Sequence, residues 1–370
     1  MGNPKTYVED LLDPNVYERI VKSIEFEEPD RIPIWDYIDN WSAVRYFAGD
    51  EKDLTKANVK TYHGLGIDLC RGFGMSYEPD LEGRVVMDGD VERKILGLTL
   101  WNNPPVKEIE GLKAYHVDLP SSEGVIEYIN SNRDCCETFA PHTMWVPGCN
   151  VGFDIYYSVT DLKLFSIASR TIPEELKRIM MERNEASLQY ARAAAEERLS
   201  PLFFIGEDIA YKGKLMFPPE YLKREFIPLL ERLCRPLKDA GIKTIFHSDG
   251  YLPDEMIDSL IEAGVEGLNP IEPLAGMDIA HLKDKYYGKL ILVGNLDCSQ
   301  ILPLSSEKEV VDETKRLIGK ASHGGGHFIG SSSEITPSTP LGNILAFYRT
   351  AHRYGRYPIK MADAQGTCFH

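Results

Sequence analysis

The sequence predicts an α/β fold and, within that class, a (β/α)8 TIM barrel. Short apolar runs alternate with helical patterns along most of the 370 residues, and eight such strand–helix units can be counted. Eight units of this kind are typical of a ring of parallel strands surrounded by helices. An open, doubly wound sheet is the alternative. It is less favoured because no Gly-x-Gly-x-x-Gly follows the first strand, and the glycine cluster 324–326 precedes a strand instead.

The predicted strands are short and apolar, and most of them end in polar residues. They lie at 32–36, 67–71, 143–147, 202–206, 243–246, 267–271, 290–294 and 326–330. The fifth shows the pattern most clearly, because its apolar run gives way at once to His247 and Asp249, and Gly250 then supplies a turn residue. In α/β folds, ligands and chemistry collect at the carboxyl ends of the strands.

Helical periodicity fills the segments between these strands. Helices are expected within 1–29 and at 53–66, 158–169, 173–198, 218–240, 253–263, 277–285, 306–320 and 340–354. The last of them follows Thr336-Pro337-Ser338-Thr339-Pro340, which supplies capping hydroxyls and prolines suited to a first helical turn.

Residues 80–130 interrupt this alternation. Runs of β type, such as 85–87 and 96–101, lie around turn residues at 88–90. Short runs separated by turns indicate an antiparallel β insertion, which we expect near the barrel mouth. We therefore expect residues 1–370 to form a single barrel domain, with 1–29 as an N-terminal helical extension.

The composition excludes several classes of function. A formal net charge of −16 without a basic patch argues against binding to nucleic acid or to an anionic membrane surface. No apolar run approaches the roughly 18 residues of a membrane span, and the N-terminus lacks the apolar core of a signal peptide. Seven irregularly spaced cysteines are typical of reduced thiols. Together these features predict a cytoplasmic enzyme.

In a barrel, the strand ends bring one set of polar and aromatic residues to a common mouth. The set comprises Trp35, Asp36, Arg71, Trp145, Glu207, Asp208, His247, Asp249, Asn269, Glu272, Asn295, Asp297 and residues 331–334. Many carboxylates around one histidine suit proton transfer or a divalent metal, because imidazole and carboxylate together can ligate zinc.

Roles can be assigned within this set as expectations. We expect His247 and Asp249 to be catalytic, and His247 and Glu207 to be metal ligands, with Asp249 as a further ligand or as a group that orients the imidazole. The residues expected to bind substrate are Trp35, Asp36, Arg71, Trp145, Asn295, Ser333 and Glu334. The structural alternatives are that Asp249 merely begins a turn and that Glu207 caps a helix or pairs with a cation.

Four segments carry a resemblance to a known family. They are Arg31-Ile32-Pro33-Ile34-Trp35, Phe246-His247-Ser248-Asp249-Gly250, Gly294-Asn295-Leu296-Asp297 and Thr336-Pro337-Ser338-Thr339-Pro340-Leu341-Gly342-Asn343-Ile344. In this order they resemble the uroporphyrinogen decarboxylase superfamily, over nearly the whole chain. The resemblance implies a (β/α)8 barrel with one of two activities: decarboxylation, or corrinoid-dependent methyl transfer with zinc at the mouth.

Two departures from the family patterns separate these branches. True decarboxylases carry an arginine-rich Arg-Gln-Ala-Gly-Arg segment soon after the first strand, whereas residues 36–41 of this chain read Asp-Tyr-Ile-Asp-Asn-Trp. These carboxylates would repel a tetrapyrrole that itself carries many carboxylates. Members that methylate thiols resemble His-x-Cys-Gly followed by a later cysteine. Here Asp249 and Ser333 stand at the two cysteine positions, and only His247 remains.

Oxygen ligands make a hard metal site, better suited to polarising an ether or phenolate oxygen than to holding a thiolate. The resemblance therefore favours an O-demethylase-type methyltransferase that uses zinc. It would move methyl from a small methoxylated or methylated donor to a corrinoid-binding partner protein. A uroporphyrinogen-decarboxylase-like lyase acting on a small carboxylated substrate without metal is the alternative, and a non-catalytic ligand-binding barrel is a third class. The sequence leaves open the identity of the donor and whether the chain is a homodimer.

Overall fold

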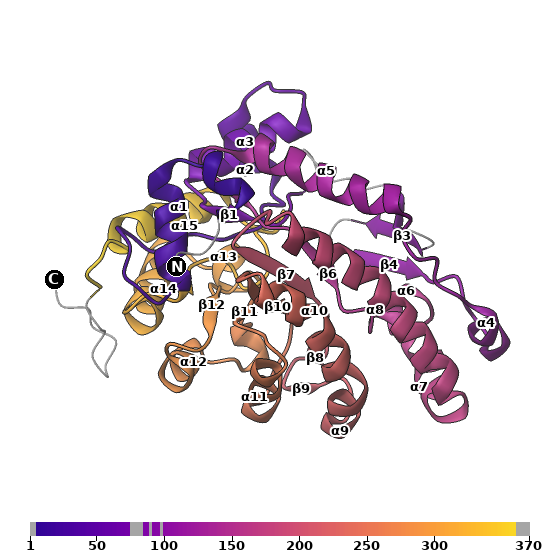
Figure 1. Cartoon of the computed structure of the whole chain (residues 1–370). Coiled ribbons are helices and arrows are strands. Elements are labelled where there is room, and N and C mark those ends of the chain that lie inside the picture. The colour runs from indigo at the N-terminus through magenta and orange to yellow at the C-terminus, as the bar shows by residue number, and fades with distance from the viewer. Residues whose placement is uncertain (1–4, 75–83, 89–90, 97–98, 360–370) are drawn as a thin grey trace.

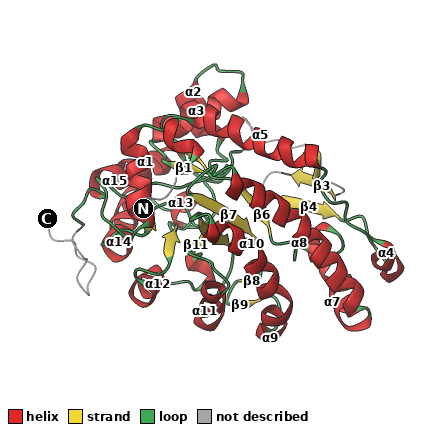
Figure 2. Ribbon diagram, in the orientation of Figure 1, coloured by secondary structure: helices red, strands yellow, loops and turns green. Residues whose placement is uncertain are grey.

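The computed structural model describes residues 5–74, 84–88, 91–96 and 99–359. Short parallel strands form its centre, inside a layer of helices (Figures 1 and 2). These central strands are β1 (Leu69–Cys70), β5 (Met144–Trp145), β6 (Gly148–Asn150), β7 (Leu202–Gly206), β10 (Lys243–His247), β11 (Gly267–Asn269), β12 (Ile291–Val293) and β13 (His327–Phe328).

The strand pairings join the eight predicted segments into a ring. Six strands pair in the order β13–β12–β11–β10–β7–β6, and β5, which lies in the same segment as β6, pairs with β1. The first predicted strand contributes single parallel bridges on both of its sides, from Ile34 to Ile329 and from Trp35 to Leu69. The pairings thus return to the strand from which they start, and the predicted (β/α)8 architecture is confirmed.

Helices follow the strands around this ring (Figure 1). They are α1 (Pro14–Ile24), α2 (Trp41–Ala48), α3 (Leu54–Leu65), α4 (Ile109–Ala114), α5 (Ser122–Phe139), α6 (Ile155–Ser158), α7 (Leu162–Thr171), α8 (Pro173–Glu196), α9 (Pro219–Tyr221), α10 (Ile227–Asp239), α11 (Asp254–Glu262), α12 (Ile279–Tyr286), α13 (Ile301–Leu304), α14 (Glu307–Ala321) and α15 (Leu341–Tyr354). Short helical turns add η1 (Tyr7–Asp10), η2 (Leu222–Phe226) and η3 (Pro273–Ala275). None of the helices in the described ranges is long and apolar enough to cross a membrane.

Alternate residues of each strand face the two sides of the barrel wall. Leu202 and Phe204 of β7 belong to an inner core to which most strands of the ring contribute, together with Ile245 of β10. Phe203 and Ile205 belong instead to the core shared with the surrounding helices. This period of two, which follows from strand geometry, decides which side chains reach the mouth.

The insertion is shorter than the predicted 80–130. Strands β2 (Arg84–Asp88), β3 (Val91–Leu96) and β4 (Thr99–Asn103) form the expected antiparallel sheet. Residues 109–114 and 122–139 are helical instead. Only three residues of α5 are buried, so its apolar stripe is too thin to be recognised as a helix from the sequence. A small hairpin, β8 (Ala210–Tyr211) with β9 (Lys214–Leu215), follows β7.

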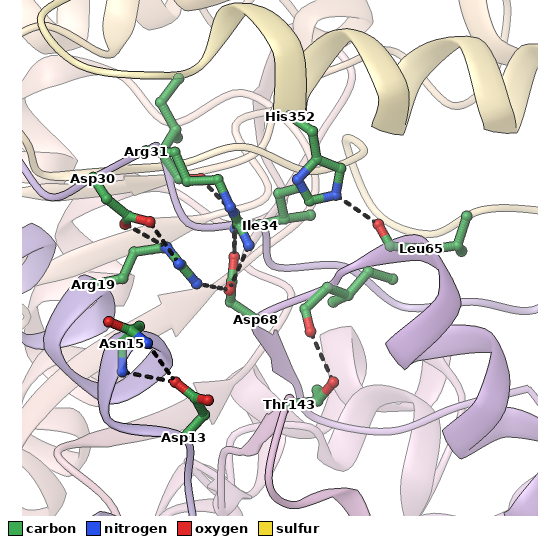
Figure 3. A network of polar contacts seen from close by, with 12 residues as sticks. Asp13, Asn15, Arg19, Asp30, Arg31, Ile34, Leu65, Asp68, Thr143 and His352 are labelled. Carbon is green, nitrogen blue, oxygen red and sulfur yellow. Dashed lines mark hydrogen bonds and ion pairs between the residues drawn. The ribbon is translucent and has the colours of Figure 1, made fainter.

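An ionic network fastens α1 to the barrel (Figure 3). Asp68, immediately before β1, accepts from Arg19 of α1 at 2.7 Å and from Arg31 at 2.7 and 2.9 Å. Asp68 also accepts from the Ile34 N–H, and Arg19 makes two further bonds to Asp30. Residues of α1 such as Ile20 and Ile24 belong to the inner core, so the N-terminal helix is part of the barrel's packing.

Candidate metal centre

Three side chains from two neighbouring strands meet at the carboxyl ends of β7 and β10. They are Asp208, His247 and Asp249, and one ligand atom from each lies within 4.8 Å of the others. His247 continues the inward-facing series of β10 from Ile245, and Asp249 is the next residue of that series. Asp208 likewise follows Phe204 and Gly206 in the inward-facing series of β7. The three residues meet because each occupies an inward-facing position just past the end of one of two paired strands.

Hydrogen bonds fix the orientation of the imidazole. Nδ1–H of His247 donates to Oδ1 of Asn269 on β11, at 2.7 Å. In the neutral ring this leaves the lone pair on Nε2, the atom that faces Oδ1 of Asp208 and Oδ1 of Asp249, each at 4.0 Å. A histidine whose other nitrogen is held by a protein oxygen is the usual arrangement of a metal-binding imidazole.

The carboxylates crowd one another. Burial raises the pKa of Asp249; the neighbouring Asp208 and Glu272 raise it further, whereas His247 and Arg71 act against them. The pKa of Glu334 is likewise raised, first by burial and then by Asp39. Among the described residues, the Oδ1 atom of Asp249 is buried without a hydrogen-bond partner. A cation placed among these oxygens would relieve both the repulsion and the unsatisfied acceptor.

The donor set therefore fits a divalent metal. Two carboxylate oxygens and one imidazole nitrogen are hard-to-borderline ligands of the kind that zinc accepts. The backbone N–H of Asp249 donates to Oδ1 of Asp208 at 2.9 Å, so the two acids are also held relative to each other.

Glu207 lies on the other face of β7. Its Oε2 accepts from the backbone N–H of Phe153 at 3.1 Å, and Phe153 belongs to the core between barrel and helices. Burial, followed by the charge of Asp154, raises its pKa well above the ordinary range. The residue predicted as the carboxylate ligand is thus one position away from the carboxylate that joins the cluster. Because residues 202–205 are all apolar, the sequence does not show which face of β7 points inward and so could not choose between Glu207 and Asp208.

Two cavities have volumes of about 300 Å³, and the first of them is lined by residues of the cluster. One is lined by Asp208, Asp249 and Glu272 together with the rings of Tyr156, Tyr157 and Tyr211. The other is lined by Arg71, Trp145 and Phe204 with polar groups of Asn132 and Asn150. One lining residue of this second cavity, Phe204, packs against the cluster, because the centroid of its ring lies 5.3 Å from that of the His247 imidazole.

Trp35 and Asp36, both predicted to bind substrate, are buried at the end of the first strand. Trp35 is 3% exposed and packs edge-on against Phe328 inside the barrel. Asp36 is 4% exposed, and its oxygens accept from the N–H and Oγ of Ser331 and from the hydroxyl of Tyr348. These two side chains support the mouth and do not line either cavity.

Four of the other predicted substrate residues lie closer to open space, whereas Asn295 does not. Trp145 and Arg71 line the second cavity, and the indole N–H of Trp145 donates to Asn132. Ser333 and Glu334 are partly exposed. Asn295 is buried and donates to the Ile271 carbonyl.

Comparison with known proteins agrees with this architecture. Residues 153–354 match the family described as Uroporphyrinogen decarboxylase (URO-D). None of the curated proteins matches the sequence. Among solved structures, a methyltransferase from Methanosarcina mazei superposes with a TM-score of 0.66 at 17% identity, covering 92% of this chain and 98% of that one. A sugar phosphate isomerase/epimerase from Parabacteroides distasonis covers 89% of this chain and 97% of its own at 11% identity. Its TM-score of 0.40 is too low to support an argument. Because the family match covers more than half of the residues, this chain belongs to the uroporphyrinogen decarboxylase family.

Proposed function

We propose that this protein is a methyltransferase that moves a methyl group from a small methoxylated or methylated donor to a corrinoid carried by a partner protein. The observation that carries the proposal is the cluster of Asp208, His247 and Asp249 at the strand ends. In the proposal these three residues hold a divalent metal, zinc by preference. Asp208 takes the place that the sequence suggested for Glu207. The methyltransferase from Methanosarcina mazei supports the proposal at the level of the fold.

When bound, such a metal supplies Lewis acidity that stabilises negative charge on the oxygen from which a methyl group leaves. The chain's own residues prepare the site for it. Asn269 keeps the lone pair of His247 on Nε2, and the N–H of Asp249 holds the Asp208 carboxylate beside it. The buried Oδ1 of Asp249 lacks a partner among the described residues and completes the donor set.

The family description favours a second candidate, a lyase that decarboxylates a small carboxylated substrate without metal. In that case His247 and Asp249 would serve as acid–base groups. Uroporphyrinogen itself is not the expected substrate. The segment after the first strand carries Asp36 and Asp39 where decarboxylases are expected to carry arginines.

The test uses purified protein, free cob(I)alamin in place of the partner, and a panel of methyl ethers and methylamines. We expect methylcobalamin to form with at least one donor, to stop forming with a chelator present, and to be lost in His247→Ala but not in the surface control Arg170→Ala. Release of CO₂ from small acids with no methylcobalamin would favour the lyase. Formation of coproporphyrinogen from uroporphyrinogen would contradict the choice of branch.

A single domain over 1–370 stays a prediction. Size-exclusion chromatography with light scattering would decide whether the chain is a homodimer.

A further inference from the structure

Arg71 lies at the edge of the candidate site, and among the described residues no acid is within ion-pair distance of its guanidinium. It follows β1 and lines the cavity of about 300 Å³ together with Trp145 and Phe204. In the described part of the chain, no hydrogen bond or ion pair joins its guanidinium to another residue. A half-buried arginine carries five N–H donors that need acceptors, so its surroundings are incomplete without a ligand or water.

Two aromatic rings hold the Arg71 guanidinium in place. Its Cζ lies 4.6 Å from the ring centroid of Phe204 and 5.5 Å from that of Tyr37. The Tyr37 ring is itself fixed, because its hydroxyl donates to the Phe73 carbonyl at 2.9 Å. Because these contacts are with aromatic rings, the N–H groups of the guanidinium remain available to hydrogen-bond a ligand in the cavity.

The same Phe204 ring contacts the candidate metal centre. Its centroid lies 5.3 Å from that of the His247 imidazole, so Arg71 and His247 are both neighbours of a single side chain. A small molecule in this cavity can therefore contact both the guanidinium and the Phe204 ring that packs against His247. Other residues that line the cavity include Trp145, Tyr128, Asn132 and Asn150.

We infer that the small-molecule substrate of this site carries a negatively charged oxyanion, of the carboxylate class, that binds the Arg71 fork. This rests on the proposed function, in which that molecule is the methyl donor. The planar fork matches a carboxylate through two parallel hydrogen bonds.

Binding can be measured without corrinoid or methyl transfer, so its outcome is separate from that of the proposed function. The probes are 4-methoxybenzoate, the neutral 4-methoxybenzamide and the cationic (4-methoxyphenyl)trimethylammonium, titrated into the full-length protein by calorimetry. Wild type should bind the benzoate at least roughly tenfold more tightly than the amide, because a charge-assisted pair is lost in the latter. The cation should bind most weakly.

Variants then assign the preference to Arg71. Arg71→Gln should abolish the difference between benzoate and amide, whereas Arg71→Lys should retain part of it, since the charge stays and the fork is lost. Arg235→Gln, on the exposed side of α10, controls for net charge, and thermal unfolding checks that each variant is folded. Three results would overturn the inference: equal binding of benzoate and amide by wild type, preference for the cation, or no binding of any probe up to millimolar concentration. An unchanged preference in Arg71→Gln would overturn it as well.

Discussion

Asp36 is a buried carboxylate that joins the first strand to the last. It accepts from Ser331 at 2.6 and 3.0 Å and from Tyr348 at 2.8 Å, and it does so while 4% exposed. Burial raises its pKa to about 6, although the hydrogen bonds from Ser331 and Tyr348 act in the opposite direction. The folded protein therefore binds a proton at Asp36 more tightly than the unfolded chain, whose aspartates titrate near pH 3.9.

This shift predicts a pH dependence of stability with a definite sign. Because the folded pKa is raised, the contribution of Asp36 is fully present below about pH 4 and is lost as the pH rises through about 6. Urea unfolding of wild type and Asp36→Asn should therefore show a larger deficit for the variant at pH 4.5 than at pH 7.5, by about 2 kcal/mol. Asp312→Asn, at an exposed position of α14, is the control. A deficit that is constant or that grows with pH would contradict the assignment.

At the scale of single elements, α1 depends on the ionic network around Asp68. The side chain of Asp68 is 1% exposed, and those of Arg19 and Arg31 are 8% and 14% exposed. Both arginines and the Ile34 N–H donate to this one carboxylate (Figure 3). Asp68 therefore links the helix to β1 and to the first strand by polar contacts, in addition to their packing in the inner core.

Removing that carboxylate should destabilise the protein strongly. Asp68→Asn removes the negative charge that balances two largely buried guanidinium groups. Removing one partner of a comparable buried ion pair lowers the free energy of unfolding by about 3–5 kcal/mol. Glu313→Gln, which disrupts a surface pair with Arg316 on α14, should cost less than about 1 kcal/mol. Chemical denaturation of both variants is the measurement. Similar losses for the two would mean that the network contributes no more than a surface pair.

At the scale of the whole molecule, the ring depends on a close approach between β13 and the first strand. A Cβ built on Gly330 would lie 2.0 Å from the carbonyl oxygen of Trp35, a backbone atom that side-chain rotation cannot move away. The adjacent bridge between Ile34 and Ile329 is one of the two contacts that incorporate the first strand. Glycine is thus required here by contact between two backbones.

Gly330→Ala should accordingly lower the free energy of unfolding by about 1–3 kcal/mol through overpacking. Gly124→Ala is the matched control, because in α5 the nearest atom to its new Cβ is 3.7 Å away. Alanine in a helix is favoured over glycine by roughly 0.5–1 kcal/mol, so this variant should be neutral or stabilised. Equal melting temperatures for wild type and Gly330→Ala would show that the joint between the strands tolerates a methyl group.

The barrel could be predicted from the sequence because its repeating pattern is local. Each strand is an apolar run and each long helix shows its own periodicity, so the sequence alone predicts all eight segments. Helix α2 was missed, although Asn40 caps it by accepting from the Ala43 N–H. Its eight residues provide too few turns for a periodic signal.

The candidate site could be predicted only in part, because its composition depends on which face of a strand a residue occupies. His247 and Asp249 were placed at the mouth, and the structure brings them together. The choice between Glu207 and Asp208 depends on which alternate residues of β7 face the inside of the barrel. The structure shows this, because it places Phe204 in the inner core. Likewise, nothing local to Asp36 reveals that Ser331 and Tyr348, about 300 residues later, enclose it.

The most direct test of the account is the metal content of two variants that differ by one position. Wild-type protein purified without added chelator should contain close to one zinc per chain by elemental analysis. Asp208→Asn and His247→Ala should lose most of it, because each removes a proposed ligand. Glu207→Gln should retain it, because that carboxylate faces Phe153 on the other side of β7. Metal-free wild-type protein that does not take up zinc in titration, or loss of zinc from Glu207→Gln but not from Asp208→Asn, would contradict the proposed centre.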